Sequence, residues 1–554
     1  MALLQRLNVQ IDQWLLPISS RLPISPWIAG LVPVFVFLVL RKAFERSSRN
    51  PRGLPLPPGP AGLPLVGNLF QIPQVHPWIV YDQWAPKYGD LTYLEVFGQS
   101  LVIINNQNAI VDILEKDSAN TSDRLWLPAW SIMELGWAFP IMSYTSWWRV
   151  HRKTFHQLLG LNQLAAYRPI IQDETAKYLR RLSSNPDGIL QETRAWLGQT
   201  IMRVSYGVND AEYNADLVKE AHAVNQGFSA SGVPGRFMVN YFPWLQYMPS
   251  WFPGTGWKVE LAEIAAASRR MVEQPFADAM KRIGSDTRDE YPNVSRTLIE
   301  GLPAESHPDY SEQATIAKNI AAVSYIAGAD TSLSGAYAII LALAMHPEVA
   351  RQGQNEIDSV VGTERLPRPE DCEQLPYIQA IVKEAARWHT IGPLSLPHMS
   401  KEDAEYNGYF LPKGTLFMPN VWGVMHDPKR FEDPLAFKPE RYMKNGQINK
   451  DVLDPGAGAF GYGRRICPGR YLSTEVLTFL TASLLSAFDV KPAKDRNGNY
   501  IPLKLEVGSE TIWSVPSNHD CSTPSFTIHN FSHTARQHLS SVMFKSVLKS
   551  TGLF

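Results

Sequence analysis

The chain has 554 residues, 45% of them hydrophobic, and a formal net charge of −1, which excludes the strongly basic surface typical of nucleic-acid-binding proteins. Its three cysteines are an odd number and far apart, so they indicate neither a disulfide framework nor a Cys-x-x-Cys zinc site, and a reducing compartment is the simpler interpretation. No internal repeat or long low-complexity linker divides the central part, so one large enzyme unit fits this length.

The first predicted element is a membrane anchor. No charged residue occurs from Leu22 to Leu40, and this stretch is long enough to span a bilayer as a helix. A basic cluster follows the apolar run instead of preceding it, which favours an uncleaved anchor over a cleavable signal peptide. We therefore expect residues 1–21 in the lumen, 22–40 in the membrane and the rest in the cytosol.

A hinge follows the anchor. The segment from Leu54 to Pro60 is rich in proline, which favours stiff extended backbone and cannot continue a helix. Residues 41–60 are therefore assigned as a basic, proline-rich spacer. Beyond it, Leu91 to Asn105 predicts a short β region, and long helical segments follow, so the predicted fold is mainly α with a small β region.

Two pairs of polar residues stand out on the predicted helices. Trp148 and Arg152 lie four positions apart, and Glu384 and Arg387 lie three apart, so each pair shares one helix face. Helical surfaces often carry such pairs, and a solvated basic helix or an ordinary surface ion pair is the alternative.

A third helix, from Thr315 to Met345, is apolar enough to be buried but contains Asp330 and Thr331. Gly328 would let a flat ligand approach, and the hydroxyl of Thr331 can open the local helix hydrogen bonding or hold a water molecule. The alternative is a polar interruption in a core helix.

A glycine-rich loop near the C-terminus presents Cys467. Gly461 and Gly463 let the backbone fold beside a flat cofactor, and Pro468 suits the first turn of a predicted helix from Tyr471 to Phe488. A thiolate at the amino end of a helix is stabilised by free N–H groups and the helix dipole, which predicts a lowered thiol pKa. We expect Cys467 to be the axial thiolate of a haem iron, although a buried free thiol would have the same sequence.

Residues on either side support this interpretation of the loop. Phe460 would shield the sulfur from water, and Arg465 would pair with a haem propionate. The spacing Phe-x-x-Gly-x-Arg-x-Cys-x-Gly resembles the haem-binding loop of the cytochrome P450 superfamily at every fixed position. The hinge and the helix motifs occur in that family's order, and the chain resembles membrane-anchored fungal enzymes of specialised metabolism (class II, microsomal type).

The resemblance implies a fold and a set of roles. It implies the cytochrome P450 fold over residues 61–508, with a long central helix over haem b and the cysteine loop below. Asp330 and Thr331 would relay protons during oxygen activation, and Arg441 would join Glu384 and Arg387 in a buried structural network. The residues implied to bind the cofactor are Trp148, Arg152, His398, Phe460, Arg465, Cys467, which is the metal ligand, and Gly469.

The implied reaction is monooxygenation of a lipophilic small molecule, for example a terpenoid. No dinucleotide fingerprint or flavin domain is evident, so electrons would come from NADPH through a separate cytochrome P450 reductase, with cytochrome b5 as a further candidate partner. The reductase would dock on a basic face, and the implied location is the endoplasmic reticulum membrane, crossed once. That face comprises Arg149, Lys153, Arg464 and Arg470.

Alternatives remain open for both substrate and activity. An indole-like, other aromatic or polyketide substrate is one alternative, and a reductase-independent isomerase or dehydratase, a non-catalytic haem protein or a structural membrane protein is another. The predicted pocket segments are apolar, with few charges beyond Glu134 and Arg236, which favours a lipophilic substrate. These segments are 125–139, 228–242, 322–327 and 391–396.

Two further segments draw predictions. Aromatic residues in 237–253 would dip into the bilayer as an access lip. After Gly508 the chain departs from the family's usual closing hairpin, so 509–554 is predicted to be an atypical tail, largely disordered from 516.

Overall fold

The computed structural model describes residues 48–284, 291–495, 497–507 and 526–530. Helices dominate it, as predicted, and the sheets are small. The longer helices are α3 (Pro77–Tyr88), α7 (Ser146–Leu159), α8 (Leu164–Ser184), α9 (Ile189–Tyr206), α10 (Ala211–Ser231), α11 (Trp257–Gly284), α12 (Val294–Glu300), α13 (Tyr310–Met345), α14 (Pro347–Val360), α15 (Pro376–Trp388) and α18 (Arg470–Ala487).

Short helices occupy the connections between them. The α-helical ones are α4 (Gln107–Ile110), α5 (Ser118–Thr121), α6 (Pro128–Ile132), α16 (Val421–Met425) and α17 (Gly456–Ala459). A π-helical segment, η2, covers Val111–Lys116. The 3₁₀ segments are η1 (Leu69–Gln71), η3 (Phe139–Ile141), η4 (Leu161–Gln163), η5 (Pro186–Gly188), η6 (Met238–Asn240), η7 (Pro243–Tyr247), η8 (Pro369–Gln374), η9 (Pro439–Tyr442) and η10 (Gly463–Arg465).

The largest sheet contains the predicted β region. Strands β1 (Leu91–Val96) and β2 (Gln99–Ile104) form an antiparallel hairpin within 91–105. Phe97 and Gly98 between them both have positive φ, which is the two-residue turn that matches the twist of a hairpin. Strand β6 (Leu416–Pro419) pairs parallel to β2, and β3 (His398–Met399) pairs antiparallel to β6. The hairpin β7 (Met443–Lys444) and β8 (Gln447–Ile448) stands apart from this sheet.

A separate compact unit joins residues 48–57 to the hairpin of β4 (Ala404–Tyr406) and β5 (Tyr409–Leu411). Arg49 and Arg52 of the predicted hinge form ion pairs with Asp403 and Glu405 of the hairpin. The backbone N–H of Phe410 also donates to the carbonyl of Pro55 over 2.8 Å. The described end of the hinge is therefore held against a specific hairpin. Residues 1–21, the anchor 22–40 and 41–47 lie outside the described residues.

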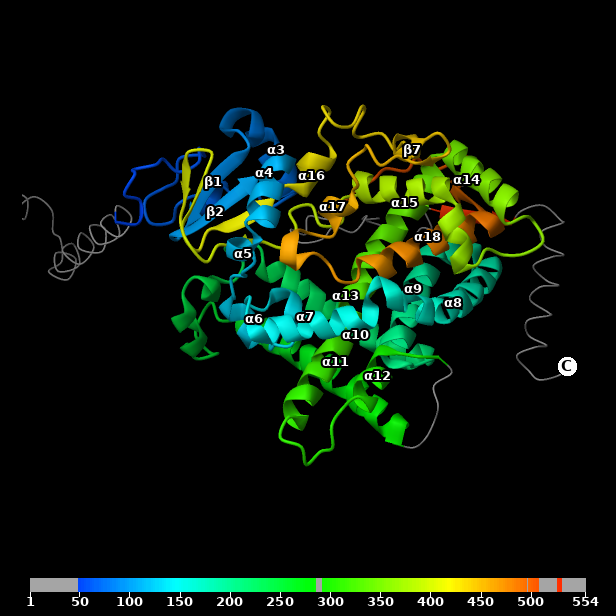
Figure 1. Cartoon of the computed structure of the whole chain (residues 1–554), viewed down its shortest axis with the longest axis horizontal. Coiled ribbons are helices and arrows are strands. Elements are labelled where there is room, and N and C mark those ends of the chain that lie inside the picture. Colours follow the sequence, from blue (N-terminus) through cyan, green and yellow to red (C-terminus); the bar gives the residue numbers. More distant parts are fainter. Residues whose placement is uncertain (1–47, 285–290, 496, 508–525, 531–554) are drawn as a thin grey trace, which may run out of the picture. The chain divides into compact units, whose positions relative to one another are not determined.

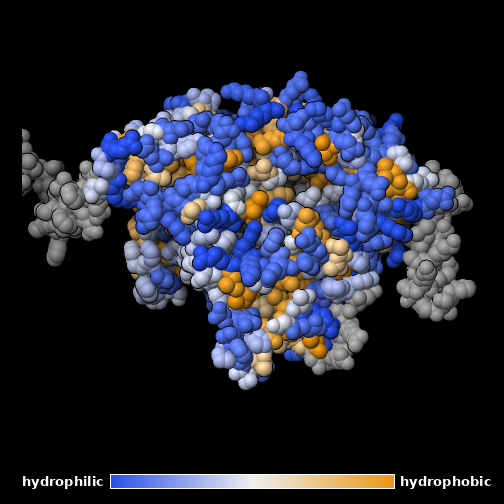
Figure 2. Space-filling model, in the orientation of Figure 1, coloured by the Kyte–Doolittle hydropathy of each residue, from blue (hydrophilic) through white to orange (hydrophobic). Residues whose placement is uncertain are grey.

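The core of the larger unit is built around α13, which extends the predicted helix 315–345 by one turn and more at its start. It packs against α9, α7, α15 and α18, and these helices surround it in Figure 1. Within the described chain, α13 is the one helix long and apolar enough to cross a membrane, but 67% of its most apolar window is buried. A core helix meets the same criteria, and the mostly hydrophilic face in Figure 2 fits a helix enclosed by polar surface.

The C-terminal tail contributes one strand. Residues Phe526–Asn530 form β10, which pairs antiparallel with β9 (Phe488–Pro492) immediately after α18. Part of the predicted tail is therefore ordered, because this segment pairs with the backbone edge of β9. The rest of 508–554, including Cys521, lies outside the described residues.

Candidate functional site

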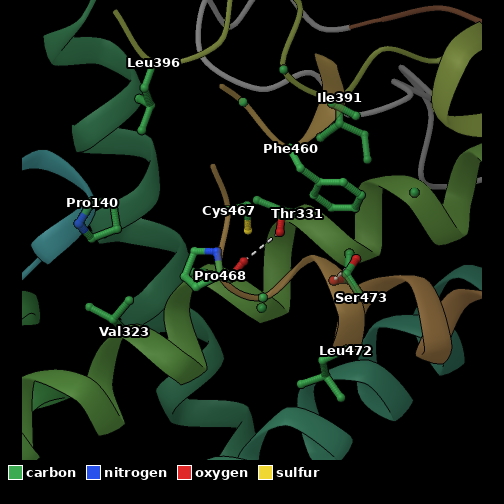
Figure 3. Close-up of a pocket in the computed structure, with 18 of the residues that line it drawn as sticks. Pro140, Val323, Thr331, Ile391, Leu396, Phe460, Cys467, Pro468, Leu472 and Ser473 are labelled. Carbon is green, nitrogen blue, oxygen red and sulfur yellow. Dashed lines mark hydrogen bonds between the residues drawn. The ribbon is translucent and has the colours of Figure 1, made fainter. Parts of the chain in front are cut away.

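A cavity of about 410 Å³ lies between α13, the cysteine loop and the start of α18. Cys467, Phe460, Thr331 and Val323 line it together, as Figure 3 shows. The remaining walls come from α7, α9, α10 and α15, from Arg124 before α6, from the segment between α6 and α7, and from the segment before β3. The cavity therefore brings together residues more than 300 positions apart in the sequence. Cys467 is the one cysteine among the described residues that line it.

The cysteine loop is held in shape by its backbone. The N–H of Cys467 donates to the carbonyl of Phe460 over 2.7 Å. Gly463 has a φ of +54°, and a Cβ there would lie 2.2 Å from the carbonyl oxygen of Leu114. This glycine is therefore required by the close approach of η2 as well as by its backbone conformation, whereas the sequence suggested only clearance for a cofactor. α18 begins at Arg470 and ends at Ala487, within a residue of the prediction at each end.

The thiol environment differs in part from the expectation. Burial raises the pKa of Cys467 above its ordinary value. The backbone N–H groups of Gly469 and Arg470 and the positive charges of Arg152 and Arg470 act in the opposite direction. The predicted lowering of the thiol pKa is thus wrong for the protein alone, because desolvation outweighs the stabilising donors. A metal cation at the sulfur would supply the missing positive charge.

Unpaired cationic donors gather at one end of the cavity. Arg465 is buried, donates to the carbonyls of Ser122 (2.7 Å) and Met142 (2.8 Å), and lies 4.3 Å above the ring of Trp148. Its third nitrogen, Nη1, has no hydrogen-bond partner among the described residues. Burial lowers the pKa of Arg465 to about 10, so the group stays charged at neutral pH.

Two further arginines, Arg152 and Arg124, line the cavity near Arg465. Arg152 lines the cavity with no hydrogen-bond or ion-pair partner in the part of the chain that the structure describes. Arg124, which the sequence analysis missed, is buried there too, and burial and the nearby Arg465 charge hold its pKa well below the usual value. Asp123 supplies one negative charge near Arg124 and Arg465, and two carboxylates of a bound group would supply more. The position of Arg124, immediately before the tryptophan-rich segment, was the available signal.

His398 on β3 lines the same end of the cavity but fits it less completely. Its Nδ1 lies 2.8 Å from the carbonyl oxygen of Thr121, so Nδ1 carries a proton and Nε2 remains for another contact. Burial, then the charge of Arg124, lower the pKa of His398 well below its ordinary value. A neutral ring presents an acceptor at Nε2, so His398 would contact a carboxylate only after protonation.

The three residues singled out on α13 have different surroundings. Thr331 lines the cavity, and its hydroxyl donates to the carbonyl of Ala327 over 2.6 Å. Asp330 is not among the described residues that line the cavity, and its carboxylate accepts instead from Nδ2 of Asn225 on α10 (2.7 Å). A Cβ at Gly328 would lie 3.3 Å from Ile201, so this glycine also permits close packing of α13 on α9.

The structure brings Glu384, Arg387 and Arg441 together. Glu384 and Arg387 are fully buried and form a bidentate ion pair, with nitrogen to oxygen distances of 2.7 and 2.8 Å. Arg441 on η9 adds a contact of 3.2 Å to Glu384. Arg387 also donates to the carbonyls of Met425 and Pro434, so the network ties α15 to the segment that leads to the cysteine loop.

The predicted pocket segments match the cavity in part. Segments 125–139, 322–327 and 391–396 each contribute lining residues, whereas only Phe228 does so from 228–242. Glu134 and Arg236 do not line it, because they form ion pairs with Arg269 and Glu260 outside. Lining residues missed by sequence reasoning include Arg124, Pro140, Ile141, Ile201, Val224 and Asn225.

The predicted basic face is organised around Tyr144. The cations of Arg149, Arg464 and Lys401 lie 5.8, 5.6 and 4.8 Å from its ring centre, and Arg464 donates to its hydroxyl over 3.0 Å. Lys401 was not predicted. Arg470 differs from the other three predicted residues, because it is half-buried and donates to the carbonyl of Cys467 over 3.0 Å.

Comparison with known proteins identifies the family of this chain. The profile of the family described as Cytochrome P450 matches residues 57–510. The chain is 48% identical to cytochrome P450 monooxygenase COX1 of Coprinopsis cinerea over 497 residues, which are 89% of this chain and 96% of that protein. It is 41% identical to COX2 of the same organism over 479 residues, covering 86% and 90%. It is also 33% identical over 482 residues to tryptamine 4-monooxygenase of Psilocybe cyanescens, covering 85% and 94%.

These findings define a haem-thiolate enzyme, in which a cysteine is the axial ligand of the iron. The chain belongs to the cytochrome P450 family, among the fungal monooxygenases.

Proposed function

We propose that this monooxygenase holds haem b through Cys467 and oxidises a neutral, lipophilic small molecule, with O₂ and electrons from NADPH delivered by a separate reductase. The observation that carries the proposal is one cavity in which the cysteine, a set of unpaired cationic donors and an apolar wall meet. The bound haem would supply the redox chemistry that inserts oxygen. The chain's own residues would bind the haem, exclude water from the sulfur and transfer protons.

The residues at the cavity fit this group. The unpaired Nη1 of Arg465, the partnerless Arg152 and the indole N–H of Trp148 would donate to the two propionates, together with Arg124. Phe460 lines the cavity beside the cysteine and would exclude water from the sulfur. Gly469 brings its backbone N–H to the sulfur and leaves no side chain in the way.

Protons would reach the site through α13. Thr331 holds a hydroxyl at the cavity, and Asp330, with its carboxylate on the α10 side, would transfer protons from that side toward the hydroxyl. Glu384, Arg387 and Arg441 do not line the cavity in the described chain, so their proposed role is to hold the loop in place.

Charge on the lining favours a neutral substrate. Asp454 is the one acidic residue among the described lining residues, and it is paired with Lys383. A substrate with a protonated amine would therefore find no free carboxylate in this lining. The relative named for tryptamine keeps an indole substrate as the second candidate, and the apolar lining favours a terpenoid-like molecule.

Membrane and partner sites are part of the proposal. The anchor 22–40 would hold the enzyme in the endoplasmic reticulum membrane, with the catalytic unit in the cytosol. Trp244, Tyr247 and Trp251 are exposed by 59, 81 and 80%, which suits a loop that enters the bilayer beside the substrate entrance. The exposed cations around Tyr144 would bind the reductase or cytochrome b5.

The deciding experiment is the ferrous carbon-monoxide difference spectrum of membranes that contain the full chain. A strongly red-shifted Soret band that disappears in Cys467→Ala and persists in Cys372→Ala would support the ligand assignment. Cys372 is the matched control because it is buried and lies outside the cavity lining. Absence of the band in the full chain would contradict the proposal.

Product analysis then separates the activities. The membranes would be supplied with the reductase and a terpenoid panel, with and without NADPH. Oxygenated products that require NADPH would support monooxygenation. Products formed without NADPH would instead indicate an isomerase or dehydratase, and no product would indicate a non-catalytic haem protein.

A further inference from the structure

One polar atom stands apart on the apolar wall of the cavity. Asn225 on α10 lines this wall next to Val224 and Phe228, with Ile201 and Val323 among the other lining residues. Its side chain is buried, with 9% of the residue exposed. A buried amide in such surroundings needs hydrogen-bond partners on both of its ends.

The orientation of this amide is set by Asp330. Nδ2 of Asn225 lies 2.7 Å from Oδ2 of Asp330. An ionised carboxylate only accepts hydrogen bonds, so the nitrogen end of the amide must face it. His222 lies on the same side, with its Nδ1 4.0 Å from the same oxygen. The carbonyl oxygen Oδ1 is therefore held on the opposite side from Asp330.

That oxygen has unused capacity. No donor to Oδ1 of Asn225 exists among the residues the structure describes. The hydroxyl groups that α13 contributes to the lining already have partners: Ser324 donates to Ser205, Thr331 donates to the carbonyl of Ala327, and Ser332 shares a hydrogen bond with Ser473. Among the described lining residues of α9, α10 and α13, Asn225 is the one that offers a side-chain carbonyl oxygen as an acceptor.

We propose that Asn225 is a specificity-determining residue, whose Oδ1 accepts a hydrogen bond from a hydroxyl group of the substrate. The substrate class is then a lipophilic alcohol, bound with its hydroxyl at α10 and its apolar body along the wall. This inference rests on the proposed function and narrows it. The pairing with Asp330 is essential, because it prevents the amide from turning its N–H₂ group into the cavity. In that orientation the amide would donate to the oxygen of an ether or a ketone as well as to that of an alcohol.

The test compares ligands that differ in one donor. Farnesol and menthol, each against its methyl ether, would be titrated into the purified full-chain holoenzyme, with the substrate-induced shift of the haem Soret band giving the dissociation constant. Each alcohol is expected to bind about fivefold more tightly than its ether, the usual effect of one neutral hydrogen bond. In Asn225→Leu, an apolar residue of similar shape, the two constants should become equal.

Two further variants keep the result interpretable. Gln226→Leu makes the same change at the next position of α10, on an exposed residue outside the lining, and should keep the preference for the alcohol. Asp330→Asn releases the amide to rotate, so the preference should fall while the carbon-monoxide band remains.

Equal binding of alcohol and ether by the unaltered protein would overturn the inference, and so would a preference that survives in Asn225→Leu. If those results came with an intact carbon-monoxide band and NADPH-dependent product formation, the role of Asn225 would be refuted and the proposed function would remain supported. Absence of the band in the unaltered protein would overturn both.

Discussion

Arg465 keeps one buried hydrogen-bond donor available for a bound group. Two of its guanidinium nitrogens bind carbonyls on separate segments, and the third has no partner among the described residues. Burying a charge in this way is costly unless the last donor is also satisfied. The planar fork of arginine suits three separate acceptors, which the single ammonium of lysine does not.

Arg465→Lys should therefore weaken retention of haem. We expect haem to leave the variant roughly tenfold faster, because charge-assisted hydrogen bonds are lost at a buried site. Transfer of haem to apomyoglobin measures the rate. Arg464→Lys is the matched control, since the neighbouring residue is exposed. Equal rates in the two variants would mean that Arg465 does not hold the cofactor.

Gly463 and Gly461 are required for different reasons: both adopt a backbone conformation with positive φ, but only Gly463 also lacks space for a side chain. Both have positive φ, but a Cβ at Gly463 would meet Leu114 at 2.2 Å, whereas the nearest atom to one at Gly461 is 3.8 Å away. Gly461→Ala should cost about 1–2 kcal/mol through its backbone conformation alone. Gly463→Ala should cost clearly more and reduce the yield of protein with the red-shifted carbon-monoxide band. Similar losses of thermal stability in the two variants would contradict this reading of the loop.

At the scale of elements, the buried ion network ties α15 to η9 and to the segment before the cysteine loop. Glu384 accepts from Arg387, from Arg441 and from the backbone N–H of Lys438 (2.8 Å). Removing its charge leaves two guanidinium groups without compensation. Such a network stabilises the fold only while it is complete.

Glu384→Gln should accordingly destabilise the protein by roughly 3–5 kcal/mol. The expected result is a large fall in soluble, haem-loaded protein and in the midpoint of thermal unfolding. Glu432→Gln makes the same change at an exposed residue nearby and should have little effect. A normal unfolding midpoint for Glu384→Gln would show that the network is dispensable.

The pairing of β9 with β10 gives a second prediction at this scale. A chain cut after Gly508 loses β10 and leaves the edge of β9 with unpaired backbone groups. We expect a lower unfolding temperature, by a few degrees, with the carbon-monoxide band retained in the folded fraction. A chain cut after Asn530 keeps the strand and is the control. If both versions melt alike, the pairing contributes nothing to stability.

At the scale of the whole molecule, the proposed function requires a surface on which an electron-donating protein can dock. The exposed cations around Tyr144 have no carboxylate partner in the described parts of the chain, and they lie close to the cysteine loop in sequence or in space. Such a surface steers an acidic partner toward the haem. Arg470 also donates to the carbonyl of Cys467, so reversing its charge would disturb the cysteine loop as well as the predicted docking face.

Reversing the charge at Arg149, Lys153 and Arg464 together should slow reduction of the haem by the reductase about tenfold at low salt. The difference should shrink as ionic strength rises, because screening weakens steering in both proteins. Stopped-flow reduction under carbon monoxide measures the rate. Lys281→Glu, an exposed cation on α11, controls for a charge reversal away from this face. A deficit that is independent of salt would indicate damage to the loop instead.

Local sequence was sufficient to single out Cys467 and its loop. The residues from Phe460 to Gly469 are contiguous, so their spacing survives folding, and the helix that follows them begins within a residue of the expected position. The helix 315–345 and the β region within 91–105 were predictable for the same reason, because the apolar run of the one and the strand-forming residues of the other are local.

Tertiary structure decided which groups meet. Asn225 and Asp330 are 105 positions apart, and Arg124 reaches the carbonyl of Leu396 over 272 positions. Nothing in either neighbourhood specifies such a partner, since helix packing alone brings α10 to α13 and the segment before α6 to the one before β3. The sign of the pKa shift of Cys467 likewise depends on how completely the folded chain removes water from the sulfur, which the loop's own residues do not reveal.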